Sequence, residues 1–163
     1  MKVLKSLAII CVALVLVTAL LMMYLFMSAE VTVEVVDSQT VSAAEVASFS
    51  TLKNTIDEET FIGTVYNKPS QWHAAEEYAY VTYNLSVKNG CLVPIELVEV
   101  QVVPLPEDVV QLGNVQEFSL NPKTEGTLNA SLLTHAGGTP AREMIVSYYV
   151  WGISFQQRIV AGK

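Results

Sequence analysis

Charged residues are missing from one long stretch of this chain, and cysteine is scarce throughout. No acidic residue, basic residue or histidine occurs between Ser6 and Ala29, a run of 24 residues that lies between Lys5 and Glu30. The chain has 2 cysteines, and only Cys91 lies outside the uncharged run. With one cysteine there, the rest of the chain cannot form an internal disulfide, so packing must hold it together.

The uncharged run predicts a membrane-spanning helix. About 20 residues, rising about 1.5 Å each, cross a hydrocarbon core of about 30 Å, and a helix satisfies its own backbone hydrogen bonds in lipid. Lys2 and Lys5 precede the run, and no basic residue follows until Lys53, so the positive-inside rule places the N-terminus in the cytoplasm. We therefore expect a single-pass cell-membrane protein with a cytoplasmic N-terminus (1–5), a transmembrane helix that contacts the lipid bilayer (6–28) and an extracytoplasmic domain (29–163).

The alternative for this run is a cleaved signal peptide. Signal peptides have apolar regions of roughly 7–15 residues and a cleavage site of small residues. Cleavage after Ala29 would place Met27 at the −3 position, and cleavage after Ser28 would place Phe26 there. Neither residue is small, so the sequence favours an uncleaved anchor. A mature N-terminus near Glu30 would decide for the signal peptide instead.

Basic residues are also few beyond the apolar run. Residues 28–163 hold all 16 acidic residues but only 7 of the 9 basic ones, so their formal charge is 7 − 16 = −9. An acidic surface argues against binding nucleic acid and against docking on anionic lipid. The partner that we expect is an envelope protein or a glycan.

Alternation of apolar and polar residues predicts strands along the rest of the chain. The clearest is Ala79–Lys88, followed by Asn89-Gly90, a dipeptide that favours the tight turn of a hairpin, and by a strand at Ile95–Val103. The other predicted strands are Val31–Val35, Phe61–Tyr66, Gln116–Leu120, Thr127–Leu133, Glu143–Trp151 and Ile153–Val160, the last two forming a hairpin at Gly152.

One segment predicts a short helix instead. Ser42 and Glu45 fit a capping box, and apolar residues recur every three to four positions up to Ile56. Acidic residues follow at once, and because the helix dipole disfavours them at a C-terminus, we expect the helix to end before Asp57.

Together these patterns predict an all-β fold, an antiparallel immunoglobulin-like β-sandwich of about seven to eight strands with one short helix, after an N-terminal transmembrane helix. Two facing sheets would bury one apolar set from each strand. The expected core residues are Val81, Leu85, Val98, Val100, Leu132, Val146, Tyr148 and Phe155.

Two stretches resemble known β-sandwich families. Tyr83–Gly90 followed by Val93–Leu97 is similar to the first hairpin of immunoglobulin-like modules and to the strand, Asn turn, Pro-Ile, strand pattern of water-stress and late-embryogenesis-abundant type domains. Phe118–Pro122 and Thr127–Leu132 resemble their next pair of strands. The resemblance covers about 70 residues. It implies an immunoglobulin-like fold, and those families have no catalytic residues to carry over; the Cys-Trp-Cys core of antibody domains is absent.

Reactive side chains are too sparse to predict chemistry. Cys91, His73 and His135 are far apart in sequence, whereas metal sites usually show His and Cys at short fixed spacings. The acidic residues form no glycine-spaced loop of the kind that binds Ca²⁺. We therefore expect no cofactor, no bound metal and no enzymatic activity.

Aromatic residues are the remaining candidates for contact with a partner or glycan. Trp72, Tyr78 and Tyr80 lie close in sequence, and Trp151 lies at the predicted hairpin tip. Exposed aromatic rings can stack on sugars or anchor a protein interface, although packing against a neighbouring loop is the simpler interpretation. The expected function is a membrane-anchored binding or scaffolding module. The alternatives are a structural accessory subunit of a cell-envelope or surface-appendage complex and a carbohydrate-binding module.

Overall fold

The computed structural model describes residues 2–27, 30–113 and 118–162. Eight strands form two antiparallel sheets, which confirms the predicted all-β sandwich architecture. The helical elements are α1 (Lys2–Met27), η1 (Ala43–Glu45), α2 (Phe49–Asp57) and η2 (Ala75–Glu77). The strands are β1 (Val31–Ser42), β2 (Gly63–Val65), β3 (Tyr78–Asn89), β4 (Glu96–Val102), β5 (Asp108–Leu112), β6 (Glu125–His135), β7 (Arg142–Val150) and β8 (Ile153–Ala161).

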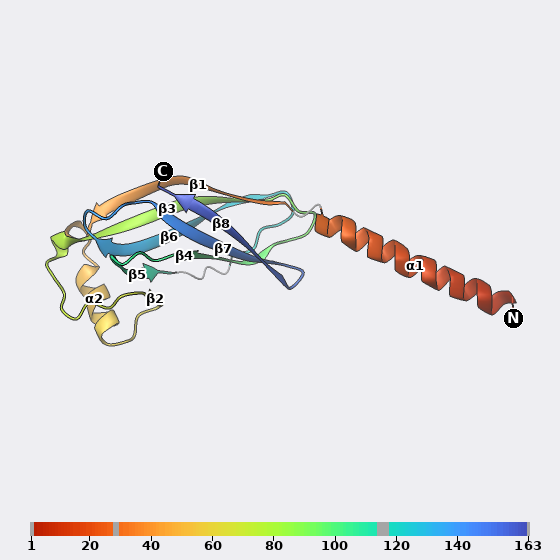
Figure 1. The fold of residues 1–163 in the computed structure, drawn as a ribbon, viewed down its shortest axis with the longest axis horizontal. Coiled ribbons are helices and arrows are strands. Elements are labelled where there is room, and N and C mark those ends of the chain that lie inside the picture. Colours follow the sequence, from red (N-terminus) through yellow and green to blue (C-terminus); the bar gives the residue numbers. More distant parts are fainter. Residues whose placement is uncertain (1, 28–29, 114–117, 163) are drawn as a thin grey trace.

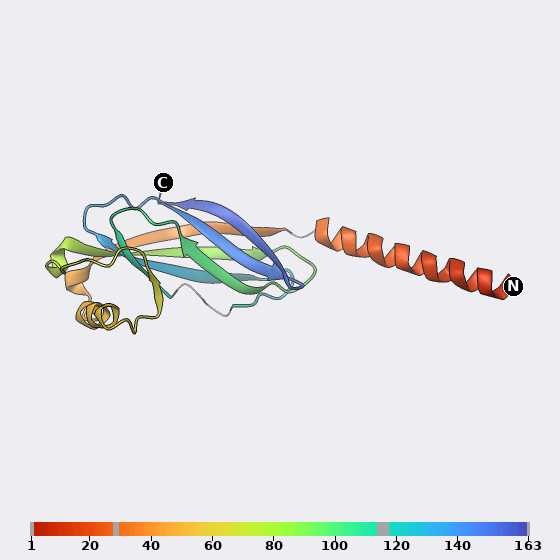
Figure 2. The ribbon, with the colours of Figure 1, turned by 60° about the horizontal axis from the view of Figure 1, so that its bottom comes forward.

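The two sheets lie face to face. One has five strands in the order β1-β3-β6-β5-β2, and the other has three in the order β4-β7-β8. Helix α1 extends from one end of this sandwich, roughly along its long axis, while α2 lies at the opposite end (Figures 1 and 2). The molecule therefore has an end next to α1 and an end far from it.

The main core fills the space between the sheets. Alternation along β3 directs Val81 and Leu85 into it, and their register partners on β6 are Leu132 and Leu128. Six of the eight expected core residues are buried: Val81, Leu85, Val98, Val100, Leu132 and Val146. Tyr148 and Phe155 are half-buried at the margin of this core, where their rings stack with centroids 5.8 Å apart.

A second apolar cluster covers the outer face of the five-stranded sheet. Leu52 and Ile56 of α2 are buried in the same cluster as Tyr80, Val110 and Leu133 of the sheet. The predicted helix is split, because Ser42 caps η1, its Oγ accepting from the Ala44 amide at 3.3 Å, and α2 begins only at Phe49. The helix also includes Asp57 as its last residue, so its predicted end is one residue short.

The predicted hairpin at Asn89-Gly90 is wrong. The strands on either side, β3 and β4, belong to different sheets, so this connection crosses the sandwich. The buried Asn89 side chain organises the crossing: its Nδ2 donates to three carbonyls, and its Oδ1 accepts from the Cys91 amide at 2.9 Å. A turn signal marks a change of direction, but it does not say which strand pairs next.

The second predicted hairpin is correct. Strands β7 and β8 pair from Arg142↔Ala161 to Val150↔Ile153 around Trp151 and Gly152. Both turn residues have positive φ, 51° and 75°, the combination that suits the twist of a two-residue hairpin. The predicted strand at Phe61–Tyr66 is shorter, at Gly63–Val65, and that at Gln116–Leu120 lies partly outside the described residues; Leu120 forms an isolated bridge with Ile95.

Candidate functional site

Two of the predicted contact residues, Trp72 and Tyr78, lie in an aromatic cluster at the end far from α1. The Trp72 ring is 6.1 Å from Phe49 and 5.7 Å from Tyr78, whose ring in turn stacks on His135 at 4.8 Å. Trp72 Nε1 donates to both carboxylate oxygens of Asp57 at 3.1 Å. Tyr78 is fully buried. This cluster fastens the loop before β3 to the end of α2 and leaves little ring surface for a ligand.

The third predicted residue, Tyr80, is buried beneath α2. Its exposed fraction is 9%, burial raises the pKa of its hydroxyl, and that hydroxyl has no hydrogen-bond partner among the described residues. It contributes to a cavity of about 280 Å³ between α2 and the sheet, lined by Ser48, Thr51, Leu52, Thr55, Tyr80 and Leu112. Tyr78 and Tyr80 are therefore packed rather than exposed, in line with the simpler interpretation, because α2 covers this part of the outward face of β3.

Trp151 lies at the other end of the sandwich. It is 46% exposed in the β7–β8 turn, which lies at the α1 end of the molecule in both views (Figures 1 and 2). The four predicted residues thus do not converge on one site. The three that are close in sequence lie at one end, where they are packed or hydrogen-bonded, and Trp151 alone remains largely exposed.

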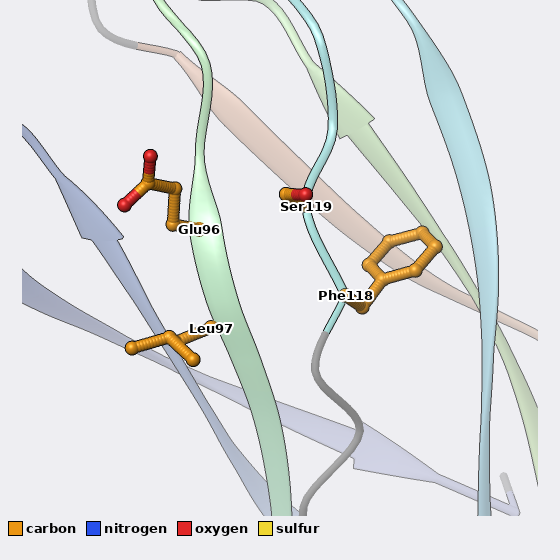
Figure 3. A pocket seen from close by; sticks show the side chains of 4 residues that line it. All are labelled: Glu96, Leu97, Phe118 and Ser119. Carbon is orange, nitrogen blue, oxygen red and sulfur yellow. The ribbon is translucent and has the colours of Figure 1, made fainter.

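The structure shows a different candidate, a groove at the margin of β4. It has a volume of about 440 Å³ and is lined by Glu96, Leu97, Phe118 and Ser119. Figure 3 shows β4 beside the segment that carries Phe118 and Ser119, with the side chains of Glu96 and Leu97 projecting away from the Phe118 ring. The groove therefore lies between two backbone segments, with side chains along its rims.

An irregularity in β4 opens this groove. The register between β4 and β7 shifts between Glu96 and Glu99, and Leu97 has a φ of 50°, which is unusual for a bulky residue. Leu97 is turned outward as a result and is 52% exposed. On either side of Leu97, hydrogen bonds join this part of the chain to the facing segment: Ile95 and Leu120 exchange two of 3.0 Å, and the Val98 amide donates to the Phe118 carbonyl at 3.3 Å.

Sequence reasoning missed this groove, although it contains one signal. Leu97 and Val98 are adjacent apolar residues within a strand that otherwise alternates, and such a break is typical of a bulge. The groove offers an apolar rim at Leu97 and Phe118 and a carboxylate at Glu96. Those groups suit a partner segment with apolar and cationic or hydrogen-bonding side chains.

Catalytic chemistry has no evident centre in the described residues. Cys91 is buried, burial raises the pKa of its thiol, and its Sγ lies 4.0 Å from the Glu30 carbonyl oxygen. His73 and His135 come within 6.3 Å between ring centroids, but no group of three or more His, Cys, Asp or Glu residues in the described ranges could hold a metal ion.

The sequence analysis also missed a buried ion pair. Arg142 and Asp108 lie on β7 and β5, and the guanidinium donates to both carboxylate oxygens, Nε to Oδ2 at 2.9 Å and Nη2 to Oδ1 at 2.7 Å. Both side chains are almost fully buried, and Arg142 Nη1 also donates to the Thr139 and Ala141 carbonyls. The guanidinium nitrogens and both carboxylate oxygens have hydrogen-bond partners, so we interpret the pair as a structural link between the two sheets.

Comparisons with known proteins add only distant structural likenesses. No protein-family model and no curated protein matches the sequence. Similar solved structures include a candidate lipoprotein of Bacillus subtilis (10% identity, TM-score 0.41, 81% of this chain), of which this chain spans only 38%. Others are an uncharacterized β-sandwich protein of Clostridium difficile (7%, 0.32, 80% of this chain and 85% of that one) and the cupredoxin domain of AmoB from Nitrosocaldus yellowstonii (14%, 0.31, 78% and 84%).

These likenesses do not assign a function. They do not show the predicted immunoglobulin-like or late-embryogenesis-abundant resemblance, which stays a prediction.

Proposed function

We propose that this chain is a single-pass, membrane-anchored binding or scaffolding module that holds its β-sandwich outside the cell membrane and acts without catalysis. The observation that carries the proposal is the exposure of α1. Its large apolar side chains from Leu7 to Tyr24 are between 55% and 69% exposed, and the segment Lys5–Leu25 is long and apolar enough to cross a membrane. Burial of such a surface in hydrocarbon is favourable, because water is unfavourable for it on every side.

Signal sequences meet the same test of length and composition. Two features of the sequence favour an anchor: the absence of small residues at the −3 position of either cleavage site, and the placement of Lys2 and Lys5 before the helix. With the helix retained, the sandwich stays close to the membrane, which raises its effective concentration for a partner in the envelope. The groove at Glu96, Leu97, Phe118 and Ser119 is the surface that we assign to that partner.

Topology is tested with cysteines placed on either side of the membrane. Native Cys91 is buried, so its labelling would report unfolding as much as location. In a Cys11→Ala, Cys91→Ala background, Ser50→Cys on the exposed face of α2 should react with an impermeant maleimide in intact cells. Val3→Cys, which keeps both Lys2 and Lys5, should react only after the cells are permeabilised. The reverse pattern, or a mature chain that begins near Glu30, contradicts the proposal.

The groove is tested by photo-crosslinking in native cells. A photoreactive residue at the exposed Ser119 should give a discrete adduct with an envelope component, and the matched probe at the exposed Ser50 should not. Loss of the adduct in a Leu97→Asp variant that still folds would tie it to the groove rim. Equal adducts at both positions would contradict a groove-specific partner.

Strand β8 favours a second candidate function, structural assembly in an envelope or appendage complex. It is the last strand of its sheet and spans nine residues, of which Arg158 alone is charged. Long edge strands with little charge can pair with a strand of another subunit. Adjacent amides in a strand point to opposite sides, so one of the Gln156 and Gln157 amides faces β7 and the other faces the free edge. Gln156→Pro and Gln157→Pro each remove one of these amides. The variant that loses the edge-facing amide should keep the fold and block assembly, and assembly by both folded variants contradicts this candidate.

A further inference from the structure

We propose that the α1 end of the sandwich is itself a lipid-contacting surface, which seats in the interfacial region of the bilayer through a basal patch of Leu92, Trp151 and Ile153. This proposal rests on the proposed function, because α1 must first hold the chain in the membrane. It adds a second membrane contact, made by the sandwich, and it fixes how the sandwich stands on the bilayer.

The basal patch lies where the chain leaves α1. Val31 at the start of β1 pairs with Asn89 at the end of β3, and the Gly90 amide donates to the Glu30 carbonyl at 2.7 Å. The loop that follows Gly90 contains Leu92 and leads into β4, whose first residue Glu96 pairs with Tyr149 near the end of β7. The β7–β8 turn therefore belongs to the same end, as Figures 1 and 2 show.

The exposed side chains of this patch are large and apolar. Leu92 is 50% exposed, Trp151 46% and Ile153 48%, and Tyr149 at the end of β7 is 37% exposed. Trp151 occupies the turn at a positive φ of 51°, a position where glycine or asparagine is the usual residue. Tryptophan and tyrosine concentrate at membrane–water interfaces because their rings are apolar while their N–H or O–H groups remain hydrated.

Charge does not drive this contact. Six acidic residues lie at the far end, on η1, α2, the residues just after α2, and η2: Glu45, Asp57, Glu58, Glu59, Glu76 and Glu77. At the basal end the exposed Lys88 and Lys123 lie among the exposed Glu30, Glu96 and Glu125. The contact that we propose is therefore made by apolar side chains with the interfacial region of the bilayer, and it does not depend on attraction to anionic lipid.

The connection to α1 is short enough to keep the basal end close to the bilayer. The apolar segment of α1 ends at Leu25, and the Glu30 carbonyl already accepts a hydrogen bond from the sandwich. Five residues span at most about 17 Å when fully extended. The headgroup region adds roughly 5–8 Å on each side of the hydrocarbon core, so the basal end lies within about 10 Å of the headgroups even if the connection is fully extended. The apolar side chains of the basal patch can therefore reach the interfacial region.

The two tryptophans allow a direct test, because they lie at opposite ends of the sandwich. Full-length protein is reconstituted into phosphatidylcholine vesicles with or without brominated acyl chains, which quench nearby indoles. The Trp72→Phe variant reports Trp151 alone, and the matched Trp151→Phe variant reports Trp72 alone. We expect brominated lipid to remove a large share of the Trp151 emission, several-fold more than of the Trp72 emission, and we expect the Trp151 emission maximum to be blue-shifted.

Two outcomes separate this inference from the proposed function. If the chain does not float with the vesicles after alkaline extraction, the anchor itself fails. If it floats but Trp151 is quenched no more than Trp72, the basal contact is wrong while the anchor stands. Should Trp72→Phe fold poorly, because it loses the hydrogen bond to Asp57, the quenching of wild type minus that of Trp151→Phe gives the same answer. Replacing Leu92 and Ile153 by serine should reduce the quenching of Trp151, and unchanged quenching would overturn the role of these two residues.

Discussion

At the scale of single residues, Arg142 and Asp108 place opposite charges in the interior, with exposed fractions of 1% and 0% for their side chains. Removing one partner leaves the other charge buried and uncompensated, so Arg142→Met should lower the free energy of unfolding by about 3–5 kcal/mol. Adding Asp108→Asn should recover part of that loss, because the amide is neutral and its oxygen can still accept from the Leu105 amide. Denaturant unfolding of the full chain in detergent measures both changes.

The exposed pair of Arg158 and Glu143 is the control for this prediction. Arg158 Nη1 and Glu143 Oε1 are 3.1 Å apart, but the side chains are 72% and 41% exposed. Arg158→Met should therefore lower the free energy of unfolding by less than about 1 kcal/mol. Equal losses in Arg142→Met and Arg158→Met, or a double variant less stable than Arg142→Met, would contradict the interpretation of the buried pair.

Two tyrosines make the stability of the sandwich sensitive to alkaline pH. Burial, with a smaller effect of Asp108, raises the pKa of Tyr66 to about 12, and burial likewise raises the pKa of Tyr83 to about 12. In the unfolded chain both phenols lose their protons near pH 10. Their contribution to stability is therefore complete below about pH 10 and is lost as the pH rises toward 12.

Tyr83→Phe should change stability differently at neutral and at alkaline pH. Near pH 7 it should cost about 1 kcal/mol, because the hydroxyl donates to the Pro140 carbonyl at 2.7 Å. Between pH 10 and 12 its unfolding free energy should fall less steeply than that of the wild type. Denaturant unfolding at a series of pH values gives the slopes, and parallel curves would show that Tyr83 does not titrate with unfolding.

At the scale of elements, a side chain satisfies backbone groups along the edge of β4 that does not pair with β7. Gln111 of β5 donates from Nε2 to the Val100 carbonyl and accepts at Oε1 from the Val102 amide, both at 2.7 Å, as a neighbouring strand would. Gln111→Leu leaves these buried backbone groups unpaired, at about 1–3 kcal/mol each. It should also raise hydrogen exchange at the Val102 amide. Gln101→Leu, on the exposed face of β4, should do neither, and similar effects at both positions would contradict this role of Gln111.

Sequence patterns predict elements whose two faces differ in environment, and they miss those whose faces are alike. Alternation predicts β3 because its inward residues meet the core while its outward residues from Thr82 to Lys88 are half-exposed or exposed. It fails for β5, where Asp108, Val109, Val110 and Gln111 are all buried between the core and the outer cluster. Asn89-Gly90 also does not predict which sheet β4 joins, since the same dipeptide suits a hairpin turn within one sheet and a connection that crosses from one sheet to the other.

The groove and the buried ion pair escape sequence analysis for a related reason. Arg142 and Asp108 are 34 positions apart, and only the register of β5, β6 and β7 across two sheets brings them together. The groove depends on a register shift near Leu97 and on the facing residues Phe118 and Ser119, which are about 20 positions away in the sequence. By contrast, the Trp151 turn is local, and its position at a hairpin tip is predicted correctly from Gly152 and the flanking alternation.

At the scale of the whole molecule, the sandwich should fold without its helix. Its main core joins residues from both sheets and needs no apolar surface of α1, whose side chains from Leu7 to Tyr24 are exposed. Both cysteines are free, so no disulfide contributes. A chain that begins at Glu30 should therefore unfold cooperatively in water, at the denaturant midpoint that full-length protein shows in detergent, and a reducing agent should not change that midpoint. Glu30 is kept because its carbonyl accepts from the Gly90 amide and closes the start of β1 against the end of β3. A truncated chain that is molten or aggregated would mean that α1 or the bilayer contributes to the fold itself.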